Sequence, residues 1–144
     1  MSVRICQSAL EAVSIIESNE IIWTHSMAAT PRVLFEALAV HAKTKTNSTL
    51  LQLQTERSEA LSDKSLSGHL RHRCYFSSTP TRSLLASGDA DYVPIFLSEF
   101  LNCFAVASKK LILQLTCHLL INMVCVLWGL LSKQLMPLVR LQKK

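Results

Sequence analysis

Glycine is scarce in this 144-residue sequence, which has three in all. The chain contains no P-loop, no dinucleotide-binding fingerprint and no Ser-His-Asp pattern. It therefore gives no indication of a P-loop nucleotide-binding protein, a dinucleotide-binding enzyme or a serine hydrolase. Its five cysteines include no Cys-x-x-Cys pair, which argues against a disulfide framework and a zinc ribbon and favours an intracellular protein with unpaired thiols. The first residues lack an apolar stretch, so we expect no secretory signal or transit peptide.

Acidic residues are absent from the last third of the chain. Residues 1–99 hold nine Lys or Arg and all ten Asp or Glu, whereas residues 100–144 hold six Lys or Arg and no acid. The net charge of +5 therefore belongs to the end of the chain. The nearly neutral remainder gives no reason to expect a nucleic-acid partner.

Hydrophobic spacing predicts alternating helices and strands in the first 99 residues. A helix is expected from Ala9 to Glu17. Thr30 and Thr79 each precede a proline, so each is expected to cap a helix whose first turn contains that proline, and Gly88 is expected to end the second of these helices. Short apolar runs predict four strands, at residues 20–23, 49–54, 72–77 and 93–97.

This order of elements is typical of an α/β fold. Both Thr-Pro helix starts come just after the end of an expected strand, as in parallel β-α-β units. We therefore predict a partial, mostly parallel sheet with packed helices over residues 1–99, followed by a separate apolar, helical and basic tail over residues 100–144. The polar segment from Glu56 to Gly68 permits no assignment.

The stretch from Gly88 to Glu99 reads GDADYVPIFLSE. A generic buried strand would need an apolar run here, but it would not require Asp91 and Tyr92 before that run or Ser98 and Glu99 after it. The stretch resembles the GxADYxPxFLSE segment of the acetyl-CoA hydrolase/transferase family, which includes the 4-hydroxybutyrate CoA-transferases. The residues that match this family motif are Asp91, Tyr92, Pro94, Phe96, Ser98 and Glu99.

The resemblance covers about residues 10–99. Gly68 to Phe76 is similar to the family's GHFR entry to a strand, and a Thr-Pro pair at Thr30 matches a second family segment. The family usually has glycines before that pair, whereas residues 23–28 contain none. This difference argues against close approach of a ligand to the loop.

The resemblance implies an N-terminal domain fragment of an enzyme that transfers coenzyme A between an acyl-CoA, such as acetyl-CoA, and a small carboxylic acid, such as acetate or 4-hydroxybutyrate, or that hydrolyses the acyl-CoA. Coenzyme A is then a substrate, and no covalently bound cofactor is implied. In this family the acyl group passes to a glutamate of the second domain. Glu99 is not expected to take that role, so we predict no catalytic residue and no activity of the chain alone. A cytoplasmic or mitochondrial location follows from the same resemblance.

Ser26 and Thr30 are the candidate residues for binding substrate or coenzyme A. They lie at an expected helix start, where hydroxyl and N–H groups suit a carboxylate or phosphate, although a helix cap without a ligand is the favoured explanation. His69, His72 and Cys74 have a spacing that could hold a metal ion. Alternation along a strand places only His72 and Cys74 on one face, so a structural role is favoured and no metal site is predicted.

The tail contains an uncharged run of 21 residues, Leu111 to Leu131, between basic flanks. Its length and flanks fit a single transmembrane helix, so a tail-anchored membrane protein is one alternative function. A non-catalytic module that binds coenzyme A is another.

The genetic code suggests a different origin for the tail. Met123 and Trp128 each have a single codon, and reading from the third base of each codon forces a glycine at both places. The neighbouring codons then permit SPPDKHG and, over residues 109–116, KIDxAxIH, which continue the same family. We therefore expect residues 100–144 to be an out-of-frame translation that forms an isolated helix with few contacts.

Overall fold

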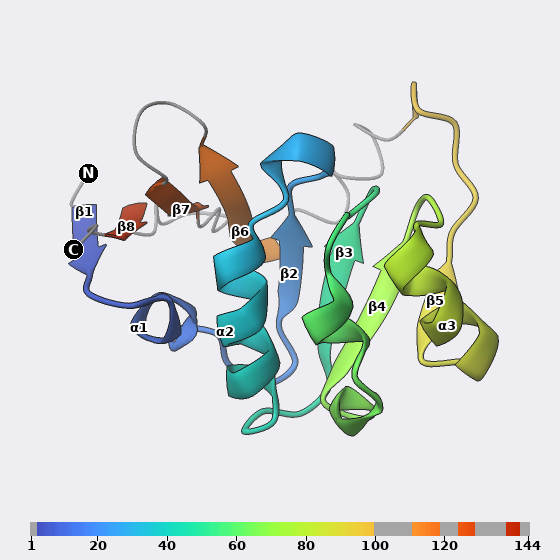
Figure 1. Cartoon of the computed structure of the whole chain (residues 1–144), viewed down its shortest axis with the longest axis horizontal. Helices are drawn as coiled ribbons and strands as arrows, with labels where there is room; N and C mark the ends of the chain where they lie inside the picture. Colours follow the sequence, from blue (N-terminus) through green and yellow to red (C-terminus); the bar gives the residue numbers. More distant parts are fainter. Residues whose placement is uncertain (1–2, 100–110, 119–123, 129–137, 142–144) are drawn as a thin grey trace.

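A computed structural model describes residues 3–99, 111–118, 124–128 and 138–141. They form an eight-stranded sheet with the strand order β1-β8-β7-β6-β2-β3-β4-β5 (Figure 1). The strands are β1 (Val3–Cys6), β2 (Ile21–Thr24), β3 (Ser48–Gln52), β4 (Leu70–Cys74), β5 (Ala90–Tyr92), β6 (Leu111–His118), β7 (Val124–Trp128) and β8 (Leu138–Leu141). The helices are α1 (Ala9–Val13), α2 (Arg32–Ala42) and α3 (Thr79–Ser87), with the short 3-10 helices η1 (Met27–Ala29), η2 (Glu59–Ser62) and η3 (Lys64–Leu66).

Five neighbouring strands, β6, β2, β3, β4 and β5, are parallel, whereas β7 is antiparallel to both β6 and β8. The predicted α/β class with a mostly parallel sheet is confirmed. From β2 the chain adds β3, β4 and β5 toward one edge of the sheet, and β6 then lies on the other side of β2. The strand order therefore reverses between β2 and β6.

The main core lies between the sheet and the helices α1 and α2. Ile22 and Leu50 of the sheet join Phe35 and Leu38 of α2 in one buried cluster, and each is at most 1% exposed. Leu51 belongs to a second cluster, with Trp23 and Tyr75. The adjacent leucines of β3 thus bury both faces of the sheet, as expected of a central parallel strand.

The strand predicted at residues 93–97 is wrong in position. β5 is Ala90–Tyr92, which lies before the apolar run, and residues 93–97 themselves are not a strand. Gly88 ends α3 in the left-handed conformation, with φ of 83°, and the N–H of Asp89 donates to a carbonyl of the last turn at 2.9 Å. This cap turns the chain directly into the sheet. Phe96 is left 76% exposed.

The expected helix caps at the two Thr-Pro pairs are also wrong. The hydroxyl of Thr30 donates to the carbonyl of Met27 at 2.7 Å, and α2 starts without a side-chain cap. The cap of α3 is Ser78 rather than Thr79, because Ser78 and Thr81 satisfy each other's backbone N–H groups in a capping box. The end of α3 at glycine is confirmed.

The tail does not form the predicted isolated helix in the part that the structure describes. Leu111–His118 is a strand, β6, and pairs in parallel with β2 near the middle of the sheet. Among residues 3–99, 111–118, 124–128 and 138–141, no helix is long and apolar enough to cross a membrane. The rest of the predicted span, residues 119–123 and 129–131, lies outside the described residues.

Candidate functional site

The carboxyl ends of β2 and β6 meet where the strand order reverses. The two strands are parallel neighbours, and η1, in the loop after β2, contacts β6. In open α/β sheets, ligands bind in the crevice outside the carboxyl ends of the strands at such a reversal. The loop of residues 25–30, which carries both candidate binding residues, lies at this place.

Hydrogen bonds from the loop after β3 fix the loop after β2. The N–H of Gln54 donates to Oγ of Ser26 at 3.3 Å, and the N–H of Met27 donates to the carbonyl of Gln54 at 2.9 Å. Thr30 is 8% exposed, and its hydroxyl donates within the loop to Met27. The hydroxyl oxygen of Ser26 accepts this hydrogen bond from Gln54, and the side chain is only partly buried, so the hydroxyl proton remains available to a ligand.

Met27 occupies a backbone conformation that favours glycine. Its φ is 54°, in the left-handed region that L-residues other than Asn and Asp rarely adopt. Its side chain is 50% exposed, so packing does not explain this conformation. The loop therefore keeps a glycine-type turn although residues 23–28 contain no glycine.

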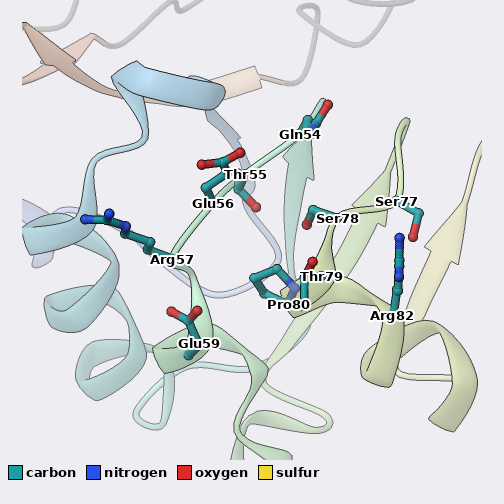
Figure 2. A pocket seen from close by; sticks show the side chains of 10 residues that line it. All are labelled: Gln54, Thr55, Glu56, Arg57, Glu59, Ser77, Ser78, Thr79, Pro80 and Arg82. Atoms are coloured by element: carbon teal, nitrogen blue, oxygen red, sulfur yellow. The ribbon is translucent and has the colours of Figure 1, made fainter.

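The best-formed pocket of the described residues lies on the same edge, beside this loop. It has a volume of about 300 Å³ and is lined by residues 54–57 and Glu59, after β3, and by residues 77–80 and Arg82, before and within α3. Figure 2 shows the two segments facing each other across it. Gln54 belongs to both places, because it lines the pocket and also binds the loop after β2.

A buried network of polar side chains joins β3, β4 and the segment after β3. Nε2 of Gln52 lies 3.0 Å from Nδ1 of His72 and 3.2 Å from Sγ of Cys74, and Oε1 of Gln52 accepts from the hydroxyl of Thr55 at 2.6 Å. Thr55 in turn contacts the hydroxyl of Ser58 at 3.2 Å. All five side chains are at most 3% exposed. The network fixes the segment after β3 that lines the pocket.

His72 is neutral in this network. Its Nε2 lies 3.1 Å from the carbonyl of Leu61, so Nε2 donates and Nδ1 accepts from Gln52. Burial lowers the pKa of His72 to about 4, against the weaker raising effect of the Leu61 carbonyl. Burial likewise raises the pKa of the Cys74 thiol, so that group is a poor thiolate nucleophile.

The prediction that His72 and Cys74 share a face is confirmed, since both are buried while Arg71 and Arg73 are exposed. His69 lies outside this face, and its Nδ1 contacts the carbonyl of Lys45. Within the described ranges, no group of three or more His, Cys, Asp or Glu could hold a metal ion.

The family-motif residues lie apart from Ser26 and Thr30. Asp91 pairs with Arg71 of β4, and the residues after it follow the outer edge of the sheet, drawn in yellow in Figure 1. Glu99 is exposed. The exposed members are Tyr92, Pro94, Phe96, Ser98 and Glu99. The structure thus separates the residues that carry the resemblance from the candidate binding loop.

The structure defines an open α/β domain whose candidate binding loop lies at the carboxyl edge of a parallel sheet. The family model described as "Acetyl-CoA hydrolase/transferase N-terminal domain" matches residues 3–114. The chain therefore belongs to this family, and the match extends beyond Glu99, where the resemblance read from the sequence stopped. A comparison with curated proteins found no match.

Solved structures support the fold. RipA from Yersinia pestis is similar with a TM-score of 0.57 and 20% identity over 67% of this chain and 25% of that chain. The decarboxylase AibA/AibB is similar with a TM-score of 0.55 and 21% identity, over 78% of this chain and 46% of that chain. An acyl-CoA transferase from E. coli, YdiF, was solved in a thioester complex with CoA. It is similar with a TM-score of 0.53 and 18% identity, over 75% of this chain and 23% of that chain. The chain thus spans about a quarter of the length of RipA.

Two residues in and beside the candidate loop, His25 and Gln54, were not identified from the sequence. His25 was passed over because a single histidine in a loop has no distinguishing pattern, although its place directly after a strand was a usable signal. Gln54 was read as the end of a strand, and its backbone bonds to Ser26 and Met27 have no sequence signature.

Proposed function

We propose that this chain supplies the N-terminal, substrate-binding half of an enzyme that transfers coenzyme A between an acyl-CoA and a small carboxylate, or hydrolyses the acyl-CoA. Family membership supports the class of substrates. The binding site is placed at the loop after β2 because this loop lies where the strand order reverses and offers the hydroxyl of Ser26. Ser26 contacts the substrate, and Thr30 positions the loop through Met27.

The site is assigned to this loop rather than to the 300 Å³ pocket beside it. That pocket has two carboxylates, Glu56 and Glu59, as well as Arg57 and Arg82 in its lining. The two acids offset the two arginines, so the pocket has no excess of positive charge for an anionic substrate, and residues 25–30 contain no acid that would repel one.

The chain alone does not turn over substrate in this proposal, because the resemblance places the acyl-accepting glutamate in a second domain. Glu99 is exposed and its backbone N–H donates to the carbonyl of Phe96 at 2.9 Å. Such a surface carboxylate lacks the enclosed surroundings that activate a nucleophile. Binding without turnover is therefore expected, and a cytoplasmic or mitochondrial location follows from the family.

The test is ligand-dependent thermal stabilisation of the 144-residue chain. Acetyl-CoA at ten times its Kd should raise Tm by about 3–6 °C. Ser26→Ala should reduce this shift, whereas Ser65→Ala, which removes an exposed hydroxyl in η3, should preserve it. Equal shifts in all three proteins would show that Ser26 does not contact the ligand, and no shift in the parent chain would refute the proposed function.

We also propose that residues 100–144 are read out of frame. The shifted reading places the family's KIDxAxIH over residues 109–116, so it supplies its own segment at the position of β6, and the location proposed for the binding loop does not depend on which reading is correct. Sequencing the transcript across the codons for Leu97 to Asn102 decides the matter. A one-base difference that restores the family reading supports the proposal, and an intact frame together with a protein mass of 16.1 kDa refutes it.

A further inference from the structure

We propose that His25 is a substrate-recognition residue whose Nε2–H, together with the hydroxyl of Ser26, binds the carboxylate of the small acid and, in the acyl-CoA, the thioester carbonyl oxygen that takes the place of that carboxylate. This inference rests on the proposed function and deepens it, because it names the group that each side chain contacts. His25 follows β2 directly, so it lies at the carboxyl end of the strand where the strand order reverses.

The hydrogen bonds of the ring fix which nitrogen carries the proton. Nδ1 of His25 accepts from the N–H of Ser26 at 2.9 Å. The same nitrogen lies 3.4 Å from the carbonyl of Ser26, a distance too long to compete with that bond. A neutral imidazole whose Nδ1 accepts must carry its proton on Nε2. His25 therefore presents Nε2–H, on an exposed side chain.

The backbone that carries His25 is held on both sides. Before it, Thr24 is fully buried, and its hydroxyl donates to the carbonyl of His25 at 3.2 Å. After it, Ser26 and Met27 are bonded to Gln54. A donor held in place before the ligand arrives binds with a smaller entropic loss.

The chemistry of the loop selects a carboxylate. Residues 25–30 contain no Lys or Arg, the side chains that phosphate esters favour, and no acid that would repel an anion. A carboxylate has two oxygens, and each of them can accept a hydrogen bond from one of these two neutral donors. The phosphates of coenzyme A are therefore expected to contact other parts of the protein.

The experiment is a histidine-detected NMR titration of the ¹⁵N-labelled chain with sodium acetate, with sodium phosphate at equal ionic strength as the control. Long-range ¹H–¹⁵N correlations should show His25 protonated at Nε2. Acetate should shift the Nε2 resonance of His25 and the amide of Ser26 together, and phosphate should not. A proton on Nδ1, or saturable acetate shifts that spare His25, would overturn the inference.

Two substitutions separate recognition from support of the loop. Asparagine can accept from Ser26 N–H as Nδ1 does but offers no donor at the Nε2 position, whereas glutamine places an N–H there. His25→Asn should weaken acetate binding about tenfold and His25→Gln less, since a lost charge-assisted hydrogen bond costs roughly this factor. Equal affinity in the parent chain and both variants would contradict the proposal.

The proposed function and this inference fail differently. If acetyl-CoA stabilises the chain but His25 does not respond to acetate, the proposed function stands and the inference is overturned. If neither acetyl-CoA nor acetate has any effect, both are overturned.

Discussion

Arg71 holds Asp91 through two parallel hydrogen bonds, from Nε to Oδ2 at 2.8 Å and from Nη2 to Oδ1 at 2.5 Å. The pair joins β4 to β5, the strand at the edge of the sheet. The guanidinium holds the pKa of the Asp91 carboxyl below its usual value. Asp91, a residue of the family motif, is therefore part of the sheet.

Replacing this carboxylate should weaken the edge of the sheet modestly. Asp91→Asn should lower the free energy of unfolding by about 0.5–1 kcal/mol at pH 7, because an exposed ion pair is screened by water. The Arg71 and Asp91 side chains are 51% and 38% exposed. Since the folded pKa is lowered, the stabilisation is complete above the unfolded pKa of about 3.9 and is lost as pH falls through the folded pKa.

Urea unfolding of the parent chain and Asp91→Asn at pH 7 and pH 3 measures this effect, with Glu36→Gln on the exposed side of α2 as the control. The difference between the parent and Asp91→Asn should shrink at pH 3. A difference of the same size at both pH values would contradict a role for the charge.

The left-handed backbone of Met27 gives a second prediction. Met27→Gly should be more stable than Met27→Ala by about 1 kcal/mol, since alanine keeps the backbone strain and glycine removes it. Both variants remove the same half-exposed side chain, so their difference isolates the backbone. Chemical denaturation provides the measurement, and greater stability of the alanine variant would show that the φ of 54° is not adopted in solution.

The cap of α3 gives a third prediction. Ser78→Ala should lower the free energy of unfolding by about 1 kcal/mol, because it removes the side chain that satisfies a backbone N–H of the first turn. Thr79→Ala should have little effect, since Thr79 is exposed and is not the cap. A larger loss in the Thr79 variant would restore the cap that the sequence suggested.

Stability should depend on pH through His72. Its pKa falls to about 4 in the folded chain, against about 6.5 when unfolded. Protonation thus favours the unfolded chain, so this stabilisation is complete above pH 6.5 and is lost as pH falls toward 4. The full loss is about 3 kcal/mol.

Unfolding measured at half-unit steps from pH 7 to pH 4 tests this dependence. The dependence of the free energy of unfolding on pH between 6.5 and 5 should persist in His25→Gln, which replaces an exposed histidine. The same dependence should be absent in His72→Gln. If the latter does not fold, the Cε1–H resonance of His72 in the parent chain gives the same information. A midpoint near 6.5 for that resonance would show that the ring is not buried as described.

The sequence predicted the parts of the fold that depend on local chemistry. Leu50 and Leu51 indicated a strand, Gly88 marked the end of α3, and alternation placed His72 with Cys74. The caps were mistaken because Ser78 and Thr79 are both capping side chains, and only the three-dimensional turn decides between them. The place of β5 depends on its pairing with β4, which joins residues far apart in sequence.

The candidate site was predicted in part. Ser26 and Thr30 were identified from a Thr-Pro pair, but the different use of their hydroxyls depends on Met27 and Gln54. The reversal of strand order beside β2 depends on β6, a strand in the segment that the sequence suggested was a helix. Long-range pairing of this kind has no local signal.

The location of the binding site is tested most directly by ¹H–¹⁵N amide spectra of the 144-residue chain during titration with acetyl-CoA. The account predicts saturable shifts that include the amides of His25 to Ala29 and of Gln54. Saturable shifts confined to the amino edge of the parallel strands, around Thr44 to Asn47, would contradict it.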